Sequence, residues 1–100
     1  MPTVVGRDQN CTHYIGRPSI FGNKYSHLKW KSNYPVVYVE TREEAIRRYE
    51  IDMRKDIKLM KAIYELPENA ILGCWCKPKA CHGDVIVKLW EELHRNDPHE

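Results

Sequence analysis

The most constraining feature of this sequence is a cluster of three cysteines and a histidine between residues 74 and 82. The cysteines are Cys74, Cys76 and Cys81, and His82 directly follows the last of them. An apolar run at residues 70–73 predicts a buried strand that continues to Cys76, after which Pro78 turns the chain. Because side chains alternate along a strand, Cys74 and Cys76 point to the same face. We therefore expect the end of a strand, a turn and the start of a helix to lie side by side.

The order of the predicted elements indicates an α/β domain. Strands are predicted at residues 11–15, 36–39 and 70–76, the second of them buried, with a long loop over residues 16–35. A capping box at residues 41–44 opens an amphipathic helix that breaks near Asp56 and ends at Pro67, and a final helix begins at Asp84. This alternation predicts a three- or four-stranded parallel or mixed sheet with two or three helices packed on it.

Length and composition narrow the classes of protein. The 100 residues suit one domain, in which we expect residues 1–10 to be irregular or a frayed edge strand and residues 96–100 to be loosely ordered. The sequence has no apolar run near the roughly 20 residues of a membrane span and no signal-peptide core at its start, so we expect a cytoplasmic protein without a membrane partner. The net charge of +2 and pI of about 8.4 fall short of a dedicated nucleic-acid binder.

The cysteine–histidine cluster has three interpretations. Cys74, Cys76, Cys81 and His82 are ligand types that zinc binds, although the C-x-C-x4-C-H spacing is unusual and adjacent helical residues would reach one ion with difficulty. Alternatively, Cys81 is a reactive thiolate at a helix N-terminus beside His82, and Asp84 caps the helix or orients His82 or a ligand. In the third interpretation the cysteines are core residues, which is most plausible for Cys74.

A glycine–arginine loop is the second candidate site. Residues 16–23 read G-R-P-S-I-F-G-N, in which Arg17 offers a planar fork for phosphate or carboxylate, and Ser19 and Asn23 add neutral donors. Beyond the loop, Lys24 is basic and Tyr25 is suited to stacking on a base. A tightly turned structural loop is the competing interpretation. Ligands of such sheets bind beyond the carboxyl ends of strands, where both motifs are expected.

Three motifs taken together resemble a family of small domains of unknown function from bacteria and their phages. They lie at residues 16–23, 41–49 and 72–85, and the last reads L-G-C-W-C-K-P-K-A-C-H-G-D-V. The family often has proline after the asparagine, whereas here Lys24 follows Asn23. The resemblance implies no reaction, but it implies that one site is shared by Arg17, Ser19, Asn23, Cys76, Cys81, His82 and Asp84.

Two hypotheses for function follow. In the first, the domain binds a nucleotide-like or other phosphate-bearing ligand through Arg17, Ser19 and Asn23. The residues that would then act catalytically in nucleotide or nucleic-acid metabolism are Cys81, His82 and Asp84. In the second, a zinc-stabilised module binds a protein or nucleic acid without catalysis. Whether the chain is an enzyme, its oligomeric state and the role of Cys11 stay open, and a host protein as partner follows only from the phage association.

Overall fold

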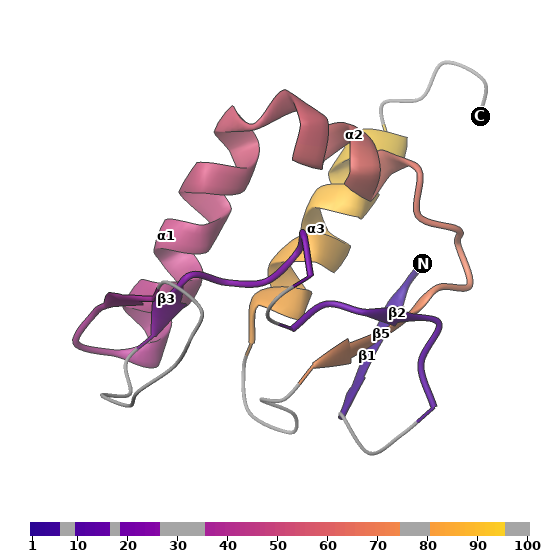
Figure 1. Cartoon of the computed structure of the whole chain (residues 1–100). Helices are drawn as coiled ribbons and strands as arrows, with labels where there is room; N and C mark the ends of the chain where they lie inside the picture. Colours follow the sequence, from indigo (N-terminus) through magenta and orange to yellow (C-terminus); the bar gives the residue numbers. More distant parts are fainter. Residues whose placement is uncertain (7–9, 17–18, 27–35, 75–80, 96–100) are drawn as a thin grey trace.

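The computed structural model describes residues 1–6, 10–16, 19–26, 36–74 and 81–95, and the larger of its two sheets is three-stranded and parallel (Figure 1). Strands β1 (Thr3–Gly6) and β2 (His13–Tyr14) flank β5 (Ile71–Cys74), so the order is β1-β5-β2. All pairings are parallel, with Gly6 opposite Cys74 and Tyr14 opposite Gly73. Of the two expectations for residues 1–10, the edge strand is therefore correct for Thr3–Gly6.

A second, two-stranded sheet stands apart from the first. It pairs β3 (Tyr25–Ser26) with β4 (Val37–Tyr38) in parallel, and β3 contacts the first helix. The strand predicted at residues 36–39 exists, but its predicted burial is wrong at Val37 and Tyr38, which are 44% and 50% exposed. Because β4 pairs only with β3 among the described strands, these two side chains face solvent and only Val39 enters the core.

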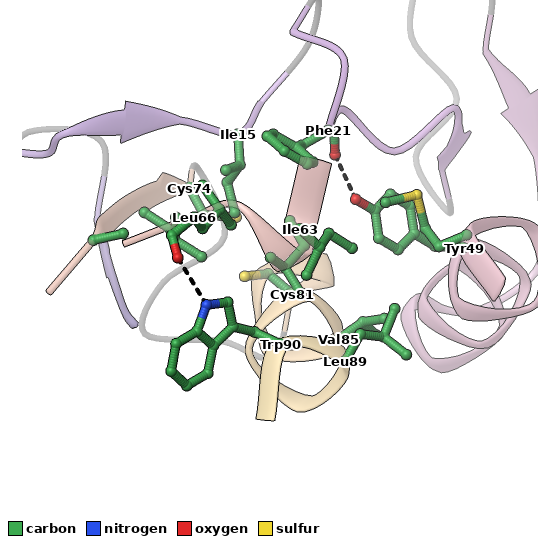
Figure 2. Packing of buried hydrophobic residues seen from close by; sticks show 14 residues of the cluster. Ile15, Phe21, Tyr49, Ile63, Leu66, Cys74, Cys81, Val85, Leu89 and Trp90 are labelled. Atoms are coloured by element: carbon green, nitrogen blue, oxygen red, sulfur yellow. Dashed lines mark hydrogen bonds between the residues drawn. The ribbon is translucent and has the colours of Figure 1, made fainter. Parts of the chain in front are cut away.

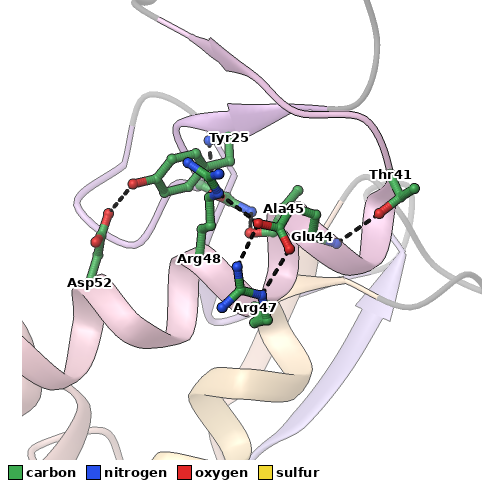
Figure 3. Close-up of polar contacts among 8 residues, drawn as sticks. Tyr25, Thr41, Glu44, Ala45, Arg47, Arg48 and Asp52 are labelled. Atoms are coloured by element: carbon green, nitrogen blue, oxygen red, sulfur yellow. Dashed lines mark hydrogen bonds and ion pairs between the residues drawn. The ribbon is translucent and has the colours of Figure 1, made fainter.

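Helices α1 (Arg42–Lys55) and α2 (Ile57–Tyr64) form the predicted amphipathic segment, with the expected break at Asp56. Thr41 caps α1 by accepting a hydrogen bond from the Glu44 N–H at 3.0 Å, as predicted (Figure 3). The second half of the predicted capping box, a hydrogen bond from the Thr41 N–H to the Glu44 carboxylate, is wrong. The Glu44 carboxylate turns away from the Thr41 backbone and accepts hydrogen bonds from Arg47 and Arg48, which lower its pKa to about 2.

Helix α3 (His82–Arg95) packs against α1, α2 and β1, and it begins two residues before the predicted start at Asp84. Its buried face carries Ile86 and Leu89, both fully enclosed, in the cluster that Figure 2 shows. Trp90 joins this core and donates from its indole Nε1 to the Leu66 carbonyl at 2.9 Å. Together the three helices and two small parallel sheets of the described residues confirm the α/β class. None of these helices is long and apolar enough to cross a bilayer.

Gly83 lets the first turn of α3 lie directly on the sheet. A Cβ atom at this position would come within 2.9 Å of Ile15 Cδ1 and of Val4 Cγ1. Such distances are shorter than packed carbon atoms tolerate, so a larger residue would force the helix away from β1. The absence of a side chain at Gly83 thus fixes where Cys81 and His82 stand relative to the sheet.

Candidate metal centre

Cys74, Cys81 and His82 form a buried cluster where β5 ends and α3 begins. One ligand atom from each, a sulfur or an imidazole nitrogen, lies within 4.8 Å of the corresponding atoms of the other two. Cys74 and Cys81 are each 1% exposed and His82 is 7% exposed. Within the described part of the chain, this is the group of His, Cys, Asp and Glu side chains close enough to hold a metal ion.

The hydrogen bond of His82 determines which ring nitrogen can bind a ligand. Its Nε2 lies 2.7 Å from the carbonyl oxygen of Ile15. Because a carbonyl oxygen only accepts, Nε2 carries the hydrogen, and in the neutral ring the lone pair is then on Nδ1. Histidines that bind metals commonly donate their other ring N–H to a backbone carbonyl in this way.

Cys81 is the capping residue of α3 and not part of its first turn. Its Sγ accepts a hydrogen bond from the Gly83 N–H at 3.3 Å, and its carbonyl accepts one from the Asp84 N–H at 3.1 Å. The Asp84 carboxylate in turn accepts from the Cys81 N–H at 3.3 Å, so Asp84 lies in the first turn and bonds back to the capping residue instead of capping α3 itself. Since Cys81 precedes the helix and His82 begins it, the expected difficulty of directing both at one point does not arise.

Tyr49 on α1 contacts the cluster from the side of the loop at residues 16–23. Its ring meets the His82 ring edge to face, with centroids 5.0 Å apart and planes at 64°. Its hydroxyl donates to the Phe21 carbonyl at 2.7 Å, which Figure 2 shows as a dashed line. In the sequence, Tyr49 belonged to the helical periodicity and to the motif at residues 41–49, but neither placed it beside His82. Nothing pointed to the Ile15 carbonyl, because a backbone acceptor leaves no sequence signal.

The residues predicted to bind a ligand on the 16–23 loop are not all brought to the cluster. Asn23 is buried against α1, where its amide donates to the Ala45 carbonyl at 3.2 Å and its oxygen accepts from the Tyr25 N–H at 2.9 Å. Ser19 lies in a turn, where its N–H donates a hydrogen bond to the Gly16 carbonyl. Its hydroxyl oxygen is buried and has no hydrogen-bond partner in the described residues.

Of the remaining candidates, some cannot be compared with the cluster. Arg17, Trp75, Cys76 and Pro78 fall outside the described residues. Cys11 is an exposed free thiol beside Gly73, where a Cβ would stand 2.7 Å from the Cys11 Sγ. Tyr25 donates to the Asp52 carboxylate at 2.6 Å, and this hydrogen bond raises the pKa of its hydroxyl (Figure 3). Tyr25 therefore links β3 to α1 and does not contribute to the cysteine–histidine cluster.

Comparison with known proteins agrees with the resemblance found in the sequence. A family model described as "Domain of unknown function (DUF4326)" matches residues 4–92. The chain is 38% identical over 68 residues to a protein of Enterobacteria phage T4 described as "Uncharacterized 12.4 kDa protein in nrdA-td intergenic region". That match covers 65% of this chain and 63% of the phage protein, so the chain spans less than two thirds of this relative. No solved structure matches the fold significantly.

Proposed function

The chain belongs to the DUF4326 family of domains of unknown function, and on this premise we propose that it is a zinc-binding α/β module whose centre includes Cys74, Cys81 and His82. The proposal is carried by one observation, the convergence of these three ligand atoms within 4.8 Å in the core. Two sulfurs and an imidazole nitrogen are a donor set that zinc favours over harder cations such as Mg²⁺ or Ca²⁺. A bound ion would link the end of β5 to the start of α3.

Burial favours a structural role for this centre. Catalytic zinc keeps one coordination position open to substrate or water, whereas structural zinc is closed by four protein ligands. Cys74 and Cys81 are enclosed almost completely, which suits the closed type. Cys76 is the candidate for the fourth ligand, because it follows Cys74 by two residues in the sequence. A structural zinc would make the domain a stable support for a binding surface.

Metal analysis of the purified chain tests the proposal. We expect about one zinc per chain in wild-type protein, and strong loss of zinc in Cys74→Ser, Cys81→Ser and His82→Ala, because each removes one ligand. Cys76→Ser tests the fourth position in the same assay. Cys11→Ser is the matched control, since its exposed thiol is not one of the grouped ligand atoms and this variant should retain full zinc content. Folded wild-type protein without metal would refute the centre.

Binding of a phosphate-bearing, nucleotide-like ligand at the 16–23 loop is the second candidate function. It is supported by the enclosed Ser19 hydroxyl, which has no hydrogen-bond partner in the described residues and could donate to a phosphate oxygen. The hydrogen bond from the Gly83 N–H to the Cys81 sulfur would stabilise a thiolate. It therefore supports the catalytic roles proposed for Cys81, His82 and Asp84.

Titration of the chain with ADP and with inorganic pyrophosphate, followed by NMR, tests this second function. We expect Arg17→Ala and Ser19→Ala to weaken binding at least about tenfold, because each removes a hydrogen bond to a charged group. Lys61→Ala is the control, as it removes an exposed positive charge from α2. Unchanged affinity in both loop variants, or no binding by wild type, would count against a ligand site on this loop.

A further inference from the structure

We propose that metal binding and the backbone turns at Ser19 and Gly22 are thermodynamically linked through two contacts of His82. This inference rests on the proposed zinc centre and assigns it a regulatory role toward the loop. The first contact is the hydrogen bond from His82 Nε2 to the Ile15 carbonyl. The second is the edge-to-face contact with Tyr49, whose hydroxyl bonds the Phe21 carbonyl.

The first contact fixes the point at which the loop leaves the sheet. Ile15 is fully buried, and its N–H donates to the Gly73 carbonyl of β5 at 3.0 Å. Its carbonyl then accepts from His82 on the other side. A metal ion on Nδ1 would hold the imidazole in one orientation and strengthen this hydrogen bond, because coordination makes the opposite N–H a better donor.

The second contact fixes the far part of the loop. Phe21 is buried in the core cluster, and its carbonyl accepts the Tyr49 hydroxyl at 2.7 Å. The Tyr49 ring lies against the same imidazole that a metal would hold. A change in the orientation of His82 would therefore alter the contacts of Ile15 and of Phe21, which lie on either side of Ser19 in the sequence.

The described segment between these two points is held by short backbone turns. Ser19 donates to the Gly16 carbonyl at 2.9 Å, and Gly22 donates to the Ser19 carbonyl at 3.0 Å. Ser19 also carries the enclosed hydroxyl proposed to meet a ligand. If these turns form best when His82 is fixed, metal binding stabilises them and favours binding of an anionic ligand at Ser19. By linkage, formation of the turns raises the metal affinity by the same factor.

The Tyr49→Phe variant tests the linkage in zinc-loaded protein. It keeps the ring beside His82 and removes only the hydroxyl bonded to Phe21. We expect zinc affinity, measured by competition with a chelator, to fall about fivefold, which is the effect of one net hydrogen bond. Amide hydrogen exchange at Ser19 and Gly22 should accelerate by a similar factor, while the Met60 amide in α2 should not change.

Tyr25→Phe is the matched control. It removes a hydroxyl bond of 2.6 Å to Asp52 on the same helix, and its ring contacts are with Lys24 and Arg48 rather than His82. Its zinc affinity should equal that of wild type. Equal zinc affinity in Tyr49→Phe and wild type, or equal weakening in both variants, would overturn the linkage while leaving the metal centre intact. Metal-free wild-type protein would instead refute the centre itself, which the metal content reveals separately.

Discussion

At the scale of single residues, Gly83 has the clearest steric role near the candidate centre. An added Cβ would meet Ile15 and Val4 at 2.9 Å, and the Gly83 N–H also bonds the Cys81 sulfur. We expect Gly83→Ala to lower the free energy of unfolding by about 1–3 kcal/mol, because α3 must shift away from the sheet. Urea denaturation measures this loss. The same shift should weaken zinc binding, since Cys81 and His82 would move relative to Cys74.

A glycine-to-alanine change can also stabilise a helix. Inside an unhindered helix, alanine is more favourable than glycine by about 1 kcal/mol. An alanine variant that is more stable than wild type and binds zinc equally well would therefore contradict the close approach of α3 to β1. Sequence alone could not predict this contact, because it brings together residues 4, 15 and 83 from separate elements.

At the scale of elements, the sequence predicted well where a local signal was strong. The hydrophobic period and the Thr41 cap located α1, and the aspartate at position 56 marked the break before α2, where its carboxylate accepts from the Leu59 N–H at 3.2 Å. The prediction failed for β3, a two-residue strand inside what we expected to be loop. Strands this short carry no period, and only tertiary pairing with β4 defines them.

The same distinction explains the error at β4. A run of β-branched and aromatic residues predicts a strand but does not say which sheet it joins. The run at residues 36–39 pairs beside α1 with β3, away from the β1-β5-β2 sheet, so Val37 and Tyr38 remain exposed. For α3, Cys81 caps the helix in place of the more usual serine or aspartate, and the predicted start was therefore two residues late.

At the scale of the whole molecule, the sequence identified the members of the candidate site but not how they combine. The motif offered Cys74, Cys76, Cys81 and His82 as metal ligands and Cys81, His82 and Asp84 as reactive groups, and it left the two interpretations equally open. The geometry brings Cys74, Cys81 and His82 together and adds the hydrogen bond from His82 to Ile15, a residue placed by the parallel pairing of β2 and β5. Long-range strand pairing of this kind has no signature in a single sequence.

The stability of the molecule should depend strongly on the proposed ion. Its larger sheet has strands of two to four residues, and a chain of 100 residues buries too little surface for a large margin of stability. With free zinc at 1,000 times its dissociation constant, the ion would add about 4 kcal/mol to the free energy of unfolding. Thermal unfolding with and without a chelator should therefore give a much lower Tm for the stripped wild-type protein. Cys81→Ser should start at that lower Tm and not respond to the chelator. A wild-type Tm that the chelator leaves unchanged would show that the core alone, without an ion between β5 and α3, holds this fold together.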